Sequence, residues 1–187
     1  MKDGLDVALY VHIPFCRAKC AYCDFNSYAH LDGAHDEYTD ALVREIELAP
    51  PLSLRTIYIG GGTPTVLPLS HFARIFEAVR RRFATGTTTE ITVEANPGTV
   101  SSELLAGLRS LGVTRLSLGV QSFIDSELRL LGRIHSTSET IKAFQALRSS
   151  GIQVATWSDG TVSEAIALVQ ENKIQLCENP SVKGHWM

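Results

Sequence analysis

Three cysteines stand close together near the start of the chain, in the pattern Cys16-x3-Cys20-x2-Cys23. Thiolates bind soft metal centres, and this short spacing lets a single loop wrap around one site. A structural zinc site usually closes with four protein ligands, whereas a four-iron cluster held by three thiolates keeps one iron open to a further ligand. The residue types and their spacing therefore favour an iron–sulfur cluster.

Two other interpretations of these thiols stay open on the residues alone. The first is a zinc site in which His12 or His30 supplies the fourth ligand. The second is a disulfide with one spare thiol, although a chain without a secretion signal favours reduced cysteines. The fourth cysteine, Cys177, stands alone near the C-terminus and is expected to be a buried or surface thiol without a role.

The composition indicates one ordinary soluble domain. The chain has 187 residues, 44% of them hydrophobic, with a formal net charge of -3 and a mean hydropathy of +0.05. These values exclude a disordered tail, a collagen-like repeat and a disulfide-stapled miniprotein. The lack of a basic excess argues against nucleic acid as a partner, and the lack of a long apolar run argues against stable membrane insertion. Residues 1–6 resemble neither a signal peptide nor a transit peptide, so we expect a cytoplasmic protein.

Short apolar runs alternate with segments of helical period along most of the chain. Such alternation predicts βαβ crossovers, a parallel sheet and therefore an α/β fold. Ser70 is a candidate cap for the second helix, and Ser136 with Glu139 forms a capping box for the fourth, which Gly151 is expected to end. The expected strands are 7–13, 56–59, 90–94, 116–120 and 152–156, and the helices lie around 38–46, 72–83, 104–111 and 139–147.

The unusual residues of the chain follow the ends of these strands. The cysteines come after the first strand, Gly60-Gly61-Gly62 after the second, Glu94-Ala95-Asn96-Pro97 after the third and Gln121 after the fourth. Ligands of parallel sheets and barrels bind at the carboxyl ends of the strands, so we expect one site there. The glycine run is either a plain turn or a place where backbone approaches a ligand closely, and without a following Gly-Lys-Ser/Thr it does not indicate a P-loop.

Segment 10–25, YVHIPFCRAKCAYCDF, closely resembles the cluster loop of radical S-adenosylmethionine (SAM) proteins, and within them the oxygen-independent coproporphyrinogen oxidase group. Later motifs follow in the order of that group. They are GGGTPT at 60–65, EANP at 94–97, RLSLGVQSF at 115–123 and LGRIH at 131–135. The resemblance extends over about residues 6–151, and the ordered set is specific even though each later motif is weak alone.

The resemblance implies that Cys16, Cys20 and Cys23 hold a [4Fe-4S] cluster whose open iron chelates SAM. An electron from the cluster would cleave the sulfonium C–S bond, giving methionine and a 5′-deoxyadenosyl radical. The implied fold is a (β/α) partial TIM-type barrel with a parallel sheet, incomplete at its C-terminal side. The residues that the resemblance places around SAM are Tyr10, Tyr22, Gly61, Gly62, Thr63, Glu94, Gln121 and Arg133, and His135 is expected to support a local turn.

Residue 25 separates two branches of the group. Coproporphyrinogen III dehydrogenases typically carry a further cysteine where this chain has Phe25, as heme chaperones of the HemW type do. The resemblance therefore implies heme trafficking or porphyrin metabolism, with heme or a porphyrin as ligand and an electron donor such as a flavodoxin or ferredoxin as partner. SAM-dependent oxidative decarboxylation of coproporphyrinogen III is the alternative, so whether the chain is an enzyme stays open.

The family pattern stops near residue 151. We expect residues 1–151 to form a radical SAM core of four βα units, and residues 152–187 to form a divergent tail that is disordered or adds one βαβ segment. Within the tail, 165–169 has the pattern of a short helix and 174–177 that of a strand. Asp159 is not given the SAM-contacting role that an aspartate has at this point in the family. An inactive truncated fragment or a zinc-binding module is therefore a further alternative.

Overall fold

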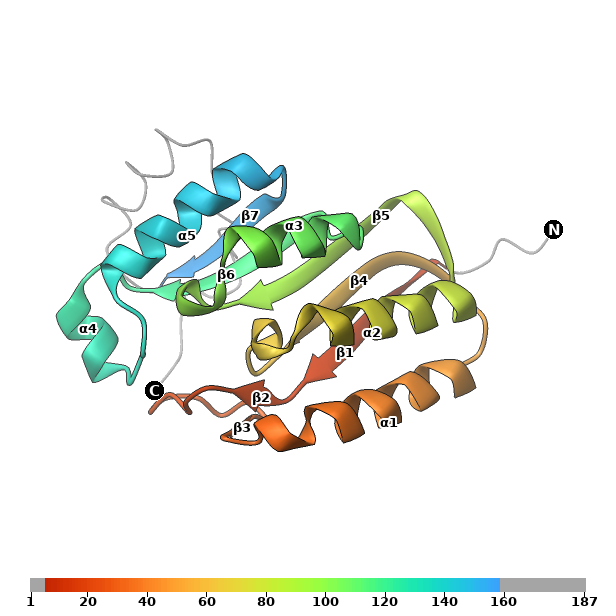
Figure 1. Cartoon of the computed structure of the whole chain (residues 1–187), viewed down its shortest axis with the longest axis horizontal. Helices are drawn as coiled ribbons and strands as arrows, with labels where there is room; N and C mark the ends of the chain where they lie inside the picture. Colours follow the sequence, from red (N-terminus) through yellow and green to blue (C-terminus); the bar gives the residue numbers. More distant parts are fainter. Residues whose placement is uncertain (1–5, 159–187) are drawn as a thin grey trace.

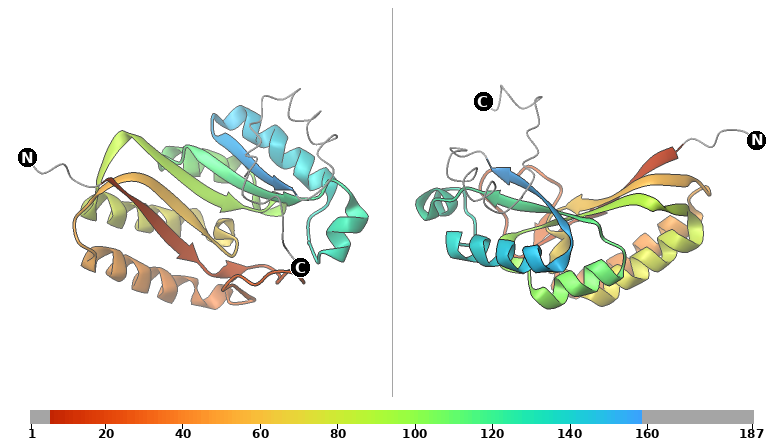
Figure 2. Two further views of the ribbon diagram at one scale, coloured as in Figure 1. Left: turned by 180° about the vertical axis from the view of Figure 1, so that it is seen from behind. Right: turned by 90° about the horizontal axis from the view of Figure 1, so that it is seen from above.

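The computed structural model describes residues 6–158, which form a parallel sheet with helices on one face (Figures 1 and 2). The strands lie in the order β1 (Asp6–Ile13), β4 (Ser53–Gly61), β5 (Ala84–Ala95), β6 (Arg115–Gln121) and β7 (Gln153–Ser158). Every neighbouring pair is parallel. Strands that follow one another in the main sheet therefore lie side by side, and the expected α/β fold is confirmed.

The long helices connect these strands and lie along the same face of the sheet. They are α1 (His35–Leu48), α2 (Leu69–Arg82), α3 (Ser102–Ser110) and α5 (Thr137–Ser150). Contacts run from α1 to α2, from α2 to α3 and from α3 to α5, so the helices follow the order of the strands (Figure 1). Within residues 6–158 the opposite face carries no helix (Figure 2), as in an open section of a (β/α) barrel. None of the described helices is both long and apolar enough to cross a membrane.

Several short elements follow the carboxyl ends of the strands, and the sequence pattern did not predict them. They are β2 (Phe15–Cys16), which pairs with β3 (Tyr28–Ala29), the 3-10 turns η1 (Asp32–Ala34), η2 (Pro64–Val66) and η3 (Pro97–Thr99), and the helix α4 (Asp125–Leu130). Because they lengthen the strand-to-helix connections at one end of the sheet, they supply the chain that surrounds the site.

Large apolar side chains fill the layer between the sheet and its helices. The stripe predicted for the second helix faces inward, and Phe72 and Phe76 are 0% and 1% exposed, with stacked rings 6.5 Å apart. On the sheet side of the same core, the strands contribute Ile57, Ile59 and Leu116, which are equally buried. A core packed this closely transmits the position of each strand to the loop that follows it.

The structure corrects details of the sequence prediction. Ser70 does not cap α2, because the helix already starts at Leu69 and Pro68 occupies the cap position without a side-chain hydrogen bond. The third strand starts at Ala84, well before the apolar run, because an exposed threonine-rich segment also pairs with β4. The fifth strand is confirmed as β7. Asp159, Cys177 and the elements expected at 165–169 and 174–177 lie outside the described residues.

The capping box at the start of α5 is confirmed. Ser136 Oγ accepts a hydrogen bond from the Glu139 amide at 3.3 Å, and the Glu139 carboxylate accepts one from the Ser136 amide at 2.8 Å. The hydrogen bonds from Ser136 hold the pKa of Glu139 below its ordinary value. The helix ends at Gly151, which is left-handed with φ 71°, as the sequence indicated.

Replacing Ser136 by alanine is expected to lower the free energy of unfolding by about 1 kcal/mol at neutral pH, because the cap is lost. A folded-state pKa below the unfolded value means that the Glu139 carboxylate stabilises the fold above its unfolded pKa. This contribution is lost as the pH falls through the lowered folded-state pKa. Ser136→Ala removes the hydroxyl donor to Glu139 but keeps the amide donor, so the difference in unfolding free energy between the wild type and the variant, measured in urea, should narrow in part on acidification. A loss no larger than that of Ser126→Ala, at an exposed position in α4, would contradict this assignment.

Candidate metal centre

The cysteine loop leaves β1 at Pro14 and is closed on itself by hydrogen bonds. The Tyr28 amide donates to the Pro14 carbonyl at 2.7 Å, which joins the two ends of the loop. Inside it, Lys19 Nζ donates to the Phe25 carbonyl at 2.7 Å and to the Ser27 carbonyl at 3.2 Å. A lysine ammonium carries three donors and no acceptor, so it can bind several carbonyl oxygens of one loop at the same time. The loop is therefore held in a fixed shape by its own residues.

The three thiols of this loop are free and half-buried, and they line one cavity of about 440 Å³. Each sulfur has one polar neighbour. Cys16 Sγ lies 3.6 Å from Thr63 Oγ1, Cys23 Sγ lies 3.9 Å from Ser27 Oγ, and Cys20 Sγ accepts from Arg133 Nη1 at 3.4 Å. The disulfide interpretation is therefore not what the structure shows.

The geometry also gives no support to a mononuclear zinc site. Both ring nitrogens of His12 are engaged, Nε2 with the Asn26 carbonyl at 2.8 Å and Nδ1 with the Tyr10 hydroxyl at 3.2 Å. His30 is exposed. In the part of the chain that the structure describes, no three His, Cys, Asp or Glu side chains meet closely enough to hold a single metal ion.

The glycine turn lies directly against the cysteine loop. The Gly62 amide donates to the Ile13 carbonyl at 2.8 Å, and the Thr63 amide donates to the Phe15 carbonyl at 2.7 Å. A Cβ on Gly62 would lie 2.6 Å from the Phe15 oxygen and 2.9 Å from Cys16 Sγ. Gly61 has φ 120°, and a Cβ there would lie 2.9 Å from the Ile13 oxygen. The close approach that the glycines allow in this structure is to the chain's own cysteine loop.

Glu94, at the end of β5, presents a fixed carboxylate to the cavity. Its Oε1 accepts from the Tyr58 hydroxyl at 2.6 Å and its Oε2 from the Gly61 amide at 3.0 Å. Burial, followed by the hydrogen bond to Glu94, raises the pKa of Tyr58. Tyr58 therefore remains a protonated donor at neutral pH, and it stacks on Tyr10 with ring centroids 6.0 Å apart.

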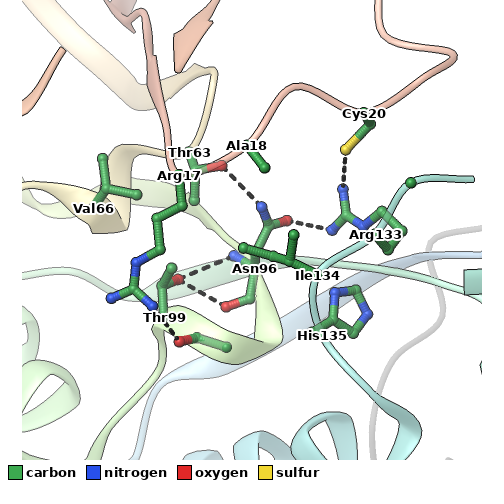
Figure 3. A pocket seen from close by; sticks show the side chains of 12 residues that line it. Arg17, Ala18, Cys20, Thr63, Val66, Asn96, Thr99, Arg133, Ile134 and His135 are labelled. Carbon is green, nitrogen blue, oxygen red and sulfur yellow. Dashed lines mark hydrogen bonds between the residues drawn. The ribbon is translucent and has the colours of Figure 1, made fainter. Parts of the chain in front are cut away.

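Arg133 reaches the same cavity from the segment after α4, although 113 positions separate it from Cys20. Figure 3 shows its contacts with Cys20 and Asn96 from the side of a smaller neighbouring pocket. Its Nη2 donates to Asn96 Oδ1 at 2.6 Å and to the Gly119 carbonyl at 2.8 Å. Its Nη1 lies between Cys20 Sγ and the Tyr22 hydroxyl, which is 3.5 Å away. The guanidinium thus brings a positive charge to the cysteine loop beside Cys20 and Tyr22.

The structure brings nearly all the residues singled out in the sequence to this one cavity. Its wall includes the three cysteines and Tyr22, Gly61, Gly62, Thr63, Glu94, Gln121 and Arg133. Tyr10 lies outside the wall, half-exposed beside Tyr58, and Gln121 has the uncommon φ of 68°. His135 is 5% exposed and its Nε2 contacts the Val120 carbonyl at 3.1 Å, so it joins the segment after α4 to β6, and this contact is not within a local turn. Asn96 and Gly119 also line the cavity, and their place there was not predicted although both lie within the sequence motifs.

The sequence model of the radical SAM superfamily matches residues 10–172. The chain belongs to the radical SAM superfamily. Membership implies a [4Fe-4S] cluster and SAM as cofactors, in agreement with a cavity lined by three free thiols.

This radical SAM chain is similar to curated heme chaperones named HemW. It is 40% identical to HemW of Escherichia coli over 153 residues, which cover 79% of this chain and 40% of the relative. It is 37% identical to HemW of Haemophilus influenzae over 156 residues, covering 79% and 41%. The chain thus spans about two fifths of the length of the curated relatives it matches.

Solved structures agree with the radical SAM assignment. Coproporphyrinogen III oxidase (HemN) from Escherichia coli, a radical SAM enzyme, aligns with a TM-score of 0.78 at 28% identity, covering 91% of this chain and 42% of that one. The structure of anSMEcpe with bound AdoMet aligns with a TM-score of 0.63 at 15% identity, over 96% of this chain and 55% of that one, and shows the shared fold. The expected partial radical SAM barrel is therefore confirmed.

Proposed function

We propose that this chain is the cluster- and SAM-binding part of a heme chaperone of the HemW type, with Cys16, Cys20 and Cys23 as the cluster ligands. The observation that carries the proposal is that three free thiols face one cavity whose wall also holds Glu94 and Arg133. When bound, the cluster supplies the electron that cleaves the sulfonium C–S bond of SAM.

The donor set fits a [4Fe-4S] cluster. Thiolates are the ligands of such clusters, and hydrogen bonds to their sulfurs tune the reduction potential. Here each sulfur has a hydroxyl or guanidinium neighbour, at distances between 3.4 and 3.9 Å. The loop that carries the thiols is fixed by Lys19 and by the glycine turn, so protein contacts hold the proposed ligands in place.

The cavity wall also fits the charges of SAM. Glu94 offers a carboxylate to the ammonium or the ribose hydroxyls, and Arg133 offers a guanidinium to the carboxylate. Gln121 and Thr63 add neutral hydrogen-bonding groups to the same wall. Tyr22, half-exposed at the cysteine loop, presents a ring on which an adenine can stack. Gly61 and Gly62 keep the wall free of side chains beside Cys16.

Phe25 and the relatives favour the chaperone branch. Phe25 lines the cavity and is 69% exposed, at the position where the dehydrogenase branch typically has a further cysteine. The similarity to HemW at 40% identity exceeds that to HemN at 28%. We therefore propose heme or a porphyrin as the transported ligand, a flavodoxin- or ferredoxin-like electron donor and a cytoplasmic location. SAM-dependent oxidation of coproporphyrinogen III is the second candidate, favoured by the TM-score of 0.78 to HemN.

Anaerobic reconstitution of the purified chain with iron and sulfide tests the proposal. We expect iron and sulfide in equal amounts, no stoichiometric zinc, and an EPR signal of the reduced cluster that SAM perturbs. Cys177→Ala is the matched control and should load the same amount of iron, because the fourth cysteine is not a proposed ligand. Stoichiometric zinc without sulfide, or a cluster that is indifferent to SAM, would overturn the proposal.

A second assay separates the two branches. The loaded chain is incubated with SAM and a reductant, with and without coproporphyrinogen III, and hemin binding is followed by its absorption. The chaperone branch predicts hemin binding and SAM cleavage that does not depend on coproporphyrinogen III. Decarboxylation of coproporphyrinogen III would instead assign the chain to the dehydrogenase branch.

A further inference from the structure

Asn96 lies at the centre of a hydrogen-bonded chain that joins two of the three thiols. Figure 3 shows the part of this chain from Thr63 to Cys20. Its Oδ1 accepts from Arg133 Nη2 at 2.6 Å, and its Nδ2 donates to Thr63 Oγ1 at 2.8 Å. Beyond these partners, Arg133 donates to Cys20 Sγ at 3.4 Å, and Thr63 Oγ1 lies 3.6 Å from Cys16 Sγ. One amide thus connects the two sulfurs through one residue on each side.

The backbone around Asn96 is fixed, so its side chain has a defined origin. It directly follows β5 and precedes Pro97, whose ring restricts the conformation of the residue before it. Thr99 Oγ1 donates to the Asn96 carbonyl at 2.7 Å, and it lies 2.6 Å from Thr65 Oγ1. The turn η3 therefore anchors Asn96 to the segment that also carries Thr63.

The chemistry of the partners decides which way the amide points. A guanidinium has donors only, so the atom that faces Arg133 must be the amide oxygen and the amide nitrogen must face Thr63. Since Thr63 Oγ1 accepts from that nitrogen, its own hydrogen is free to point at Cys16 Sγ. The orientation of the Asn96 amide thus directs one donor at each sulfur, the Thr63 hydroxyl at Cys16 and the Arg133 guanidinium at Cys20.

Asn96 is also neutral, so it binds Arg133 without offsetting the positive charge of the guanidinium. The salt bridges among residues 6–158 do not include Arg133, whose Nη2 acceptors are an amide oxygen and the Gly119 carbonyl. A Cβ on Gly119 would lie 2.9 Å from Asn96 Oδ1, so the absence of a side chain there makes room for the pair. The guanidinium therefore faces Cys20 with its full positive charge.

We infer that Asn96 is a positioning residue that directs hydrogen bonds from Thr63 and Arg133 onto the sulfurs of Cys16 and Cys20 and so raises the reduction potential of the cluster. The inference rests on the proposed function, in which these thiols are cluster ligands. Reduction adds negative charge to the cluster, and donors aimed at its ligand sulfurs stabilise that charge. Asn96 acts through its two neighbours and needs no contact of its own with the cluster or with SAM.

Asn96→Asp is the sharpest test, because it changes charge and hydrogen-bond direction with almost no change in shape. An aspartate pairs with Arg133 and neutralises it, and it accepts from the Thr63 hydroxyl instead of donating to it, which turns that hydrogen away from Cys16. The control is Asn26→Asp, which adds the same charge to the cysteine loop at an exposed side chain. Midpoint potentials of the reconstituted full chains are measured by EPR-monitored redox titration.

We expect a midpoint potential more negative in Asn96→Asp than in the wild type and in Asn26→Asp, at similar iron content per chain. Thr63→Val removes the donor to Cys16, together with the acceptor of the Asn96 amide, but leaves the charge beside Arg133 unchanged, so it should shift the potential in the same direction by a smaller amount. If Asn96→Asp does not load a cluster, the midpoint potential of Thr63→Val tests the inference in its place. Potentials of Asn96→Asp and Asn26→Asp that coincide, or an unshifted Thr63→Val, would overturn the inference. A wild-type chain that loads no cluster would instead overturn the proposed function.

Discussion

Gly62→Ala is expected to remove most of the iron–sulfur cluster from the reconstituted chain while the sheet stays folded. A methyl group at residue 62 would lie 2.6 Å from the Phe15 carbonyl oxygen and 2.9 Å from Cys16 Sγ. The Phe15 oxygen cannot move away cheaply, because it accepts from the Thr63 amide at 2.7 Å. Cys16 or the whole loop must therefore shift. Changes to the outer-shell contacts that orient metal ligands typically cost about 10- to 100-fold in metal affinity, and we expect a loss of at least this size.

Iron and sulfide content per chain after reconstitution measures this effect, and circular dichroism confirms that the fold persists. Gly33→Ala is the matched control, since a Cβ there meets no atom within 4 Å and the variant should load like the wild type. Gly61→Ala should be at least as damaging, because the added side chain also conflicts with φ 120°. Wild-type iron content in Gly62→Ala would show that the loop is looser than its contacts indicate.

Much of the fold could be predicted because apolar periodicity is a local property of the sequence. The stripe 72–79 shows that a helix packs one face inward, and the run 116–120 shows a buried strand, whatever the rest of the chain does. The start of β5 was missed for the opposite reason. Its first residues are polar and exposed, and they become strand through pairing with β4, which only the assembled sheet provides.

The site was predictable as a set of residues and not as a set of contacts. Parallel strands bring their carboxyl ends together, so the cysteines, Glu94 and Gln121 could be assigned to one place from strand order alone. The contact between Arg133 and Cys20 spans 113 positions and depends on how the segment after α4 returns across β6. The role of Gly62 was similarly hidden, because its neighbour in this structure is the cysteine loop itself.

Tyr58→Phe is expected to weaken SAM binding by about 10-fold without changing the iron content, because a hydrogen bond to a carboxylate contributes about 1.5–3 kcal/mol. The Tyr58 hydroxyl and the Gly61 amide each hold one oxygen of Glu94, at 2.6 and 3.0 Å. Without the hydroxyl, the carboxylate is free to rotate away from the position it presents to the cavity. Titration of the loaded chain with SAM, followed by EPR or calorimetry, measures the affinity.

Two comparisons decide whether the Tyr58 hydroxyl acts through Glu94. Tyr28→Phe removes the same atom from an exposed ring in β3 and should leave SAM affinity unchanged. In a Glu94→Gln background, the Tyr58 substitution should cost little further affinity, since residues that act as one unit are not additive. Equal losses in both backgrounds would assign the hydroxyl a separate role. A loss of unfolding free energy in Tyr58→Phe with unchanged SAM affinity would show that the Tyr58–Glu94 hydrogen bond is only structural. A carboxylate other than that of Glu94 would then have to contact SAM.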